Sequence, residues 1–201
     1  MTVRPLVYSD RKAALAAVGV SLWLLSVELG TSRAATAAAA SRSHEQVVDA
    51  SSSRRFDLSA GVALTGGLAA PLALPGGTIA ARRTAFATGL VTLAGCGVLS
   101  RRARHHLGRF HRHHLTVHPD HVLVDTGPYR VVRHPLYAAT IGVFVGLGLV
   151  LGHWASVALA ALPAAALLRR LGTEEPMLVD ALGDQYVAYQ ARTARLLPGI
   201  W

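Results

Sequence analysis

Charged residues are scarce in this chain, and acidic residues are the scarcest of them. Only 15% of the 201 residues are charged, with 11 Asp or Glu against 20 Lys or Arg. Soluble domains carry about a quarter of their residues as charged side chains. The mean hydropathy of +0.38 points the same way. Composition therefore argues against an ordinary soluble domain and indicates a membrane protein.

Cysteine and aromatic residues are also few. Cys96 is the single cysteine, so no disulfide framework can form within the chain, and its apolar surroundings favour a small core residue. Aromatic residues make up 6% of the chain. The basic face with stacking aromatics that single-stranded nucleic acid needs is missing, and we expect no nucleic-acid partner. The net charge of +9 is better explained by topology and anionic lipid headgroups.

Long apolar runs are what the sequence does contain. Five of them approach the roughly 20 residues that a spanning helix needs: 13–30, 58–75, 84–100, 136–151 and 153–168. The polar, Ser- and Arg-rich segment 31–57 is predicted to be a surface loop. The chain is expected to be an all-α integral membrane bundle of about five transmembrane helices. We divide it into three N-terminal transmembrane helices, residues 1–100, and a catalytic core, residues 101–201.

Only Gly152 separates the last two runs, so they predict a helical hairpin that enters and leaves the membrane on one side. Gly142 and Gly146 form a GxxxG pattern in the first helix of that hairpin. The pattern either permits close contact with the second helix or reflects the frequency of glycine in membrane helices. The arginine-rich segments 101–135 and 171–201 then share a side, which the positive-inside rule assigns to the cytoplasm. The Ala- and Arg-rich composition suggests a bacterial inner membrane.

The C-terminal segment predicts a cytoplasmic helix. Thr173 is a plausible N-cap, Glu174 and Glu175 suit the first turn, and Pro is tolerated directly after them. Tyr186 and Tyr189 lie about one turn apart, so they share a face of this helix.

Two short segments of the sequence, called the two corners below, carry polar groups suited to binding a ligand. In "GPYRVVRHPLYAATIGVFVG", residues 127–146, a stiff Gly-Pro turn precedes Arg133 and His134, which stand at a helix start where anions are attracted. Glu174 and Glu175 form the other corner, and carboxylates near membrane depth are costly unless they meet cations or hydroxyls. A ligand with ammonium, sulfonium, carboxylate and ribose groups, such as S-adenosylmethionine, matches both corners. Arg–Glu pairing between the corners explains the same residues structurally.

The segments "LVDTGPYRVVRHPLYAATIGVFVGLGLVL" and "EEPMLVDALGDQYVAYQARTARLLPGIW" resemble the isoprenylcysteine carboxyl methyltransferase family and its bacterial relatives, over residues 107–201. The shared pattern is G-P-Y, R-H-P-x-Y, a hairpin, E-E-x-x-L and G-x-x-Y-x-x-Y-x-x-R. Two departures are visible: Leu182 stands where the family usually has Phe, and Pro176 directly follows the paired glutamates.

The resemblance implies a membrane methyltransferase that uses S-adenosylmethionine on the cytoplasmic side. The cofactor-binding residues that it implies are Gly127, Pro128, Tyr129, Arg133, His134, Pro135, Tyr137, Glu174 and Glu175. It also implies that Arg192 holds the carboxylate of the methyl acceptor, because a guanidinium binds a carboxylate bidentately. Tyr189 or His134 would serve as the base for a thiol or amine acceptor. We expect a lipophilic small molecule or lipid as substrate, membrane lipids around it, and no obligate protein partner.

Several alternatives stay open at this point. The acceptor could be a phospholipid amine or a small thiol, and the chain could be a non-catalytic membrane protein. Seven histidines, His105, His106, His111, His113, His114, His118 and His121, resemble the histidine boxes of membrane di-iron oxidoreductases. Those boxes lie in separate loops, whereas these residues share one stretch. An interfacial basic segment that gains charge as pH falls is therefore favoured, and we expect no metal.

Overall fold

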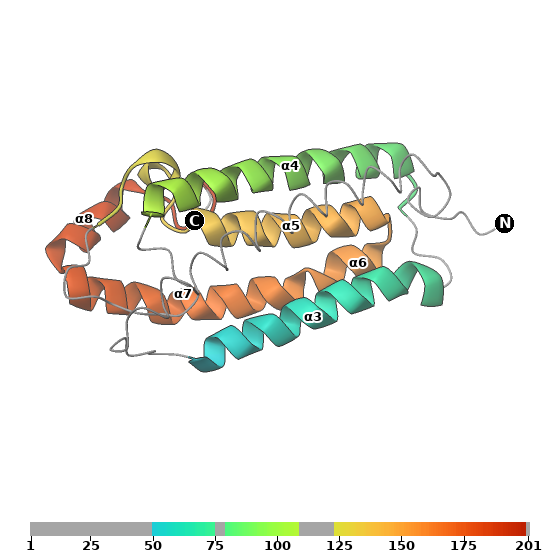
Figure 1. The fold of residues 1–201 in the computed structure, drawn as a ribbon, viewed down its shortest axis with the longest axis horizontal. Coiled ribbons are helices and arrows are strands. Elements are labelled where there is room, and N and C mark those ends of the chain that lie inside the picture. Colours follow the sequence, from blue (N-terminus) through green and yellow to red (C-terminus); the bar gives the residue numbers. More distant parts are fainter. Residues whose placement is uncertain (1–49, 75–78, 109–122, 200–201) are drawn as a thin grey trace.

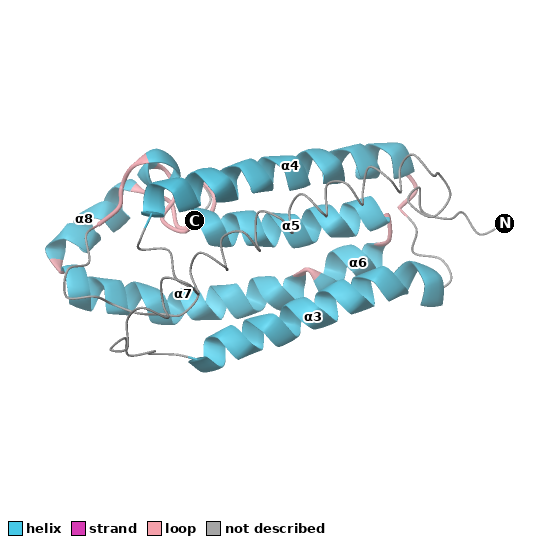
Figure 2. Cartoon of the chain, viewed as in Figure 1, coloured by secondary structure: helices cyan, strands magenta, loops and turns pink. Residues whose placement is uncertain are grey.

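A computed structural model describes residues 50–74, 79–108 and 123–199. The regular elements in these ranges are all helices, as Figure 2 shows. They are α3 (Ala50–Ala73), α4 (Arg82–Leu107), the 3₁₀ turn η2 (Gly127–Arg130), α5 (Pro135–Leu151), α6 (Trp154–Leu159), α7 (Ala161–Leu182) and α8 (Asp184–Arg192). The predicted all-α bundle is confirmed. The first predicted run, 13–30, lies outside the described residues.

The described helices cross the length of the bundle four times, with α3, α4, α5 and the α6–α7 pair alternating in direction (Figure 1). Ser51–Ala73, Arg83–Leu107 and Trp154–Leu182 are long and apolar enough to span a membrane, and Pro135–Leu151 is a shorter apolar helix. Large apolar side chains face outward, including Leu58 at 72% exposure and Leu72 at 75%. Such faces suit contact with lipid.

The core of the bundle lies where α4 and α5 pack together. Leu93 on α4 is fully buried and contacts the cluster around Val150 on α5. Phe86, Leu90, Val143 and Leu147 complete this cluster. The predicted hairpin is also confirmed, because α5 ends at Gly152, which has a left-handed φ of 65°, and α6 follows directly.

The two glycines of the GxxxG pattern contact a different helix from the one expected. A Cβ added at Gly142 would meet the Sγ of Cys96, and one added at Gly146 would meet Leu93, so both glycines face α4. The second helix of the hairpin is instead approached by Gly148, whose added Cβ would lie 2.7 Å from the Cα of Val157. Of the two interpretations that the sequence left open, the structure shows close helix contact, but with α4. Both α4 and α6 pack against α5, and the spacing of the glycines could not indicate which of them they contact.

Two predicted boundaries are wrong. Helix α3 begins at Ala50, so residues 50–57 are helical instead of looped, and Arg55 donates to Ser51 one turn earlier. Helix α7 continues to Leu182, so Thr173 lies inside a helix and does not cap one. No residue within α7 has a positive φ, and the first one after it is Gly183, whose φ of 58° separates α7 from α8. A helix that leaves the membrane can continue into water without ending at the membrane surface, because water hydrogen-bonds to the polar side chains of its exposed face.

Candidate functional site

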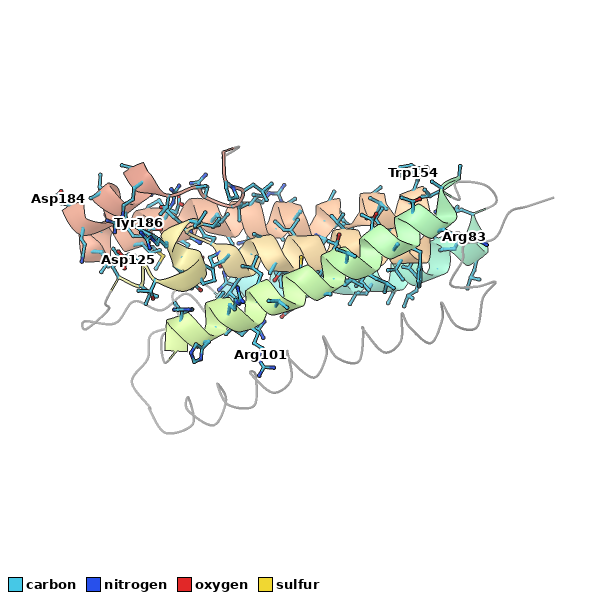
Figure 3. The ribbon with its side chains drawn as sticks, turned by 90° about the horizontal axis from the view of Figure 1, so that it is seen from above. Arg83, Arg101, Asp125, Trp154, Asp184 and Tyr186 are labelled. Carbon is cyan, nitrogen blue, oxygen red and sulfur yellow. The ribbon has the colours of Figure 1, made fainter. Side chains whose placement is uncertain are left out.

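The predicted site residues gather at one end of the bundle. This end holds the C-terminus of α4, the start of α5, the end of α7 and all of α8 (Figure 1). In Figure 3, Asp125, Asp184 and Tyr186 lie at this end, while Arg83 and Trp154 lie at the other. The up-and-down topology therefore brings together segments that are some 40 to 60 residues apart in sequence.

The η2 turn requires glycine at position 127 for two reasons. Gly127 has a φ of 58°, a backbone conformation that side chains disfavour. An added Cβ would also collide with the ring of His106, which comes from the end of α4. The Nδ1 of His106 lies 3.2 Å from the Oγ1 of Thr126. The turn is thus held against α4, and Tyr129 within it is buried.

After η2 the chain pairs with the C-terminal tail through a short parallel bridge between Val132 and Ala194. The backbone N–H of Arg133 donates to the carbonyl of Ala194 at 2.8 Å, and that of His134 donates to Arg195 at 3.1 Å. Pro135 then begins α5 with His134 at the N-cap position, as predicted. These bonds fix the entrance of α5 against the tail.

Glu175 is the centre of a buried ion-pair network. Its side chain is 6% exposed, and its Oε1 accepts from the Nε of Arg133 at 3.1 Å and lies 3.2 Å from the Nε2 of His134. Its Oε2 accepts from the Nε of Arg195 at 2.8 Å and also from the Nη2 of Arg195. The hydrogen bonds to Glu175 raise the pKa of Arg195. Arg–Glu pairing between the two corners is therefore present in the structure.

Arg133 also binds the tail directly. Its Nη1 donates to the carbonyl of Gln190 at 3.0 Å and to the carbonyl of Thr193. One guanidinium thus joins the start of α5, the end of α7 and the residues after α8. Lysine could not replace Arg133 here, because its single ammonium nitrogen lacks the planar set of donors that a guanidinium offers.

Glu174 lies in a different environment from its neighbour. It is only partly buried, and its Oε2 accepts a hydrogen bond of 2.5 Å from the hydroxyl of Tyr137. The Tyr137 ring stacks on His134 with centroids 5.6 Å apart, and Arg170 lies 6.0 Å from the same ring. Glu174 and Tyr137 therefore form a partly accessible acidic and aromatic surface beside the buried network.

Three tyrosines support this end of the molecule. Tyr186 and Tyr189 share a face of α8 as predicted, are 2% exposed, and have ring centroids 5.8 Å apart. The hydroxyl of Tyr189 donates to the carbonyl of Tyr129 at 2.6 Å. Burial raises the pKa of Tyr189 to about 12, and it also raises the pKa values of Tyr129 and Tyr186. Tyr189 therefore stays protonated near neutral pH, which does not suit the predicted role of a base.

Arg192 lies at the outer edge of the site. Its side chain is 60% exposed, and its Nη2 donates to the Oδ2 of Asp125 at 2.6 Å. Its guanidinium carbon also lies 5.9 Å from the centroid of the Tyr189 ring. The geometry shows that a carboxylate can reach this guanidinium.

The structure brings all nine predicted cofactor-binding residues to one end of the bundle, but ligand binding by them stays a prediction. Sequence reasoning missed Asp125, Gln190, Thr193 and Arg195 as members of the same cluster. Asp125 stands two residues before the Gly-Pro turn, a position that could have marked it. Of the histidine segment, only His105 and His106 are described, and no metal-binding group of His, Cys, Asp or Glu occurs within the described ranges.

Comparison with known proteins gives two matches. The family model for phospholipid methyltransferases matches residues 84–185, just over half of the chain. A protein-S-isoprenylcysteine O-methyltransferase from Schizosaccharomyces pombe is 35% identical over 80 residues. That match covers 39% of this chain and 34% of the yeast protein, so the chain spans about a third of its relative's length.

The matched family range begins in α4 and ends in α8, so it includes the η2 turn, the hairpin and both glutamates. It covers nearly all of Arg83–Leu107 and Trp154–Leu182, two helical segments that are long and apolar enough to span a membrane, and the shorter apolar helix Pro135–Leu151. The chain therefore belongs to the phospholipid methyltransferase family of integral-membrane methyltransferases.

Proposed function

We propose that this chain transfers a methyl group from S-adenosylmethionine to a lipophilic acceptor, most specifically to a carboxylate. The observation that carries the proposal is the convergence of the η2 turn, Tyr137 and Glu174 at one end of the bundle. The active site would face the cytoplasm of a bacterial cell, because the described arginines at the end of α4, around η2 and at the end of α8 lie at that end. A lipid-borne acceptor would reach it from within the membrane.

The residues present fit the proposed cofactor. Glu174 offers a partly exposed carboxylate next to an aromatic ring, which suits the cationic sulfonium and ammonium groups of the cofactor. When bound, S-adenosylmethionine supplies an activated methyl group on a sulfonium. Glu175 is buried among Arg133, His134 and Arg195, so we assign it a positioning role in place of the direct contact that the resemblance implied.

Arg192 would orient a carboxylate acceptor. Its Nη2 already pairs with Asp125, and an acceptor carboxylate could take that place and bind the guanidinium through two donor nitrogens. A carboxylate is deprotonated at neutral pH and needs no general base. Tyr189 would then act only through its bond to Tyr129, by holding the η2 turn in place.

A phospholipid amine is the second candidate acceptor, because the matching family model is named for phospholipid methylation. The purified full chain would be incubated with donor carrying a radiolabelled methyl group. One reaction would contain an S-prenylated N-acetylcysteine, and the other would contain phosphatidylethanolamine. A methyl ester releases its label in mild alkali, whereas an N-methyl group does not.

We expect alkali-labile label on the prenylated cysteine derivative, and none after Arg192→Gln. Alkali-stable label on phosphatidylethanolamine would show that the methyl acceptor is an amine and not a carboxylate. The absence of labelled product from both acceptors, together with no binding of S-adenosylhomocysteine in calorimetry, would contradict the methyltransferase proposal for this site.

A further inference from the structure

One face of α4 changes from apolar to basic along its length. Val91 is 72% exposed and Val98 is 47% exposed, and the exposed residues Arg102 and His105 follow at steps of three or four. Such steps keep side chains on one side of a helix. In Figure 3, the side chain of Arg101 extends away from the other described helices. This face is therefore turned away from the other described helices.

A surface hollow of about 300 Å³ lies at the basic end of this face. It is lined by Val98, Arg101, Arg102, His105 and His106. Its size is at the lower end of ligand pockets, which run from roughly 300 to 1,000 Å³. Among the residues that the structure describes, none supplies a carboxylate within ion-pair distance of Arg101 or Arg102. The hollow therefore joins two arginines that no described carboxylate neutralises to the apolar side chain of Val98.

The described part of the chain leaves room for an acyl chain next to the hollow. Gly95 lies one turn before Val98 on the same face, and a Cβ added there would meet no described atom within 4 Å. Val91 is exposed one further turn away. A ligand with an anionic head and a long apolar tail would thus meet cations at one end and apolar helix surface at the other.

We propose that this hollow binds the headgroup of an anionic phospholipid from the surrounding bilayer. The two arginines would hold the phosphate through their planar donor forks. The acyl chain would lie along Gly95 and Val91. Basic residues at the end of a membrane helix attract anionic lipid, and here they line a defined hollow and not merely a charged surface.

The bound lipid would contact the η2 turn through one shared residue. His106 lines the hollow, and it also lies against Gly127 and Thr126. A phosphate in the hollow would therefore restrict the residue that packs on the turn. Neither Glu174 nor Tyr137 lines the hollow, so lipid binding there does not require the proposed methyl transfer to be correct.

The test is native mass spectrometry of the delipidated full chain, titrated with dioctanoyl phosphatidylglycerol, dioctanoyl phosphatidylcholine or inorganic phosphate. We expect phosphatidylglycerol to bind about tenfold more tightly than phosphatidylcholine, and Arg101→Gln/Arg102→Gln to remove that preference. The matched control is Arg54→Gln/Arg55→Gln, which removes the same charge from exposed positions on α3 at the same end of the bundle. It should keep the preference.

A second variant separates a built site from diffuse attraction. Val98→Trp fills the hollow without changing charge, and it should weaken binding of phosphatidylglycerol about as much as the double arginine change. Equal binding of the two lipids, equal losses in both double variants, or unchanged binding by Val98→Trp would overturn the proposal. Inorganic phosphate that displaces the lipid at equal concentration would identify a free-anion site instead, which also overturns it.

Discussion

Glu174 and Glu175 are adjacent in sequence but point in directions about 100° apart, because that is the rotation per residue of an α-helix. Glu175 is 5% exposed and pairs with Arg133, His134 and Arg195. Glu174 is partly exposed and accepts from Tyr137. One carboxylate therefore maintains the structure, and the other is accessible to a ligand.

Neutralising each glutamate should separate these two roles. Glu175→Gln leaves the partly buried Arg133 and Arg195 without their buried counter-charge, and losing one partner of a buried pair costs about 3–5 kcal/mol. We expect the Tm in detergent to fall by roughly 6–20 °C. Glu174→Gln should leave Tm nearly unchanged but weaken S-adenosylhomocysteine binding about tenfold in calorimetry. Equal effects of the two variants on Tm would contradict this division.

Asp125 should compete with an acceptor carboxylate for Arg192. The pair is exposed, at 60% and 44% for the two side chains, and exposed ion pairs contribute only about 0–1 kcal/mol. Asp125→Asn should lower KM for a carboxylate acceptor by up to about fivefold with little change in kcat. The control is Asp184→Asn, an exposed acid at the same end of the bundle. A KM that stays constant in Asp125→Asn would argue that the acceptor does not bind at Arg192.

At the scale of elements, the packing of α4 against α5 depends on small residues at the points of closest approach. A Cβ added at Gly89 would lie 2.8 Å from backbone atoms of Gly146 and Val150, which cannot move independently of α5. The same addition at Gly95 would meet no described atom within 4 Å. The two positions lie on one helix, so their intrinsic helix propensities are alike and only packing distinguishes them.

Gly89→Ala and Gly95→Ala therefore make a matched pair. Overpacking at Gly89 should destabilise the protein by about 1–3 kcal/mol. Alanine at Gly95 should be neutral or should stabilise it by up to about 1 kcal/mol, because alanine favours helix. Thermal unfolding in one detergent compares the variants directly. A similar Tm for both would show that the α4–α5 contact is looser than described.

At the scale of the whole molecule, the up-and-down topology assembles the site from segments that no local pattern connects. Arg133 and Glu175 are 42 residues apart, and Tyr189 and Tyr129 are 60 apart. The hairpin of α5 with α6 and α7 returns the chain to the end where it entered (Figure 1). The bridge between Val132 and Ala194 then closes the tail over that entrance. A bundle with one more or one fewer crossing between these segments would place them at opposite ends.

The sequence by itself determined the all-α membrane fold, the hairpin at Gly152 and the start of α5 at Pro135, because these depend on apolar run length and on local backbone preferences. It also marked both corners of the candidate site through residue types at fixed spacing. Only the tertiary structure decided that Gly142 and Gly146 face α4, that α7 continues through Thr173, and that Glu175 is enclosed while Glu174 is not. The physical reason is that helix faces are chosen by the partners available for packing and ion pairing. Those partners are distant in sequence and become neighbours only once the bundle has formed.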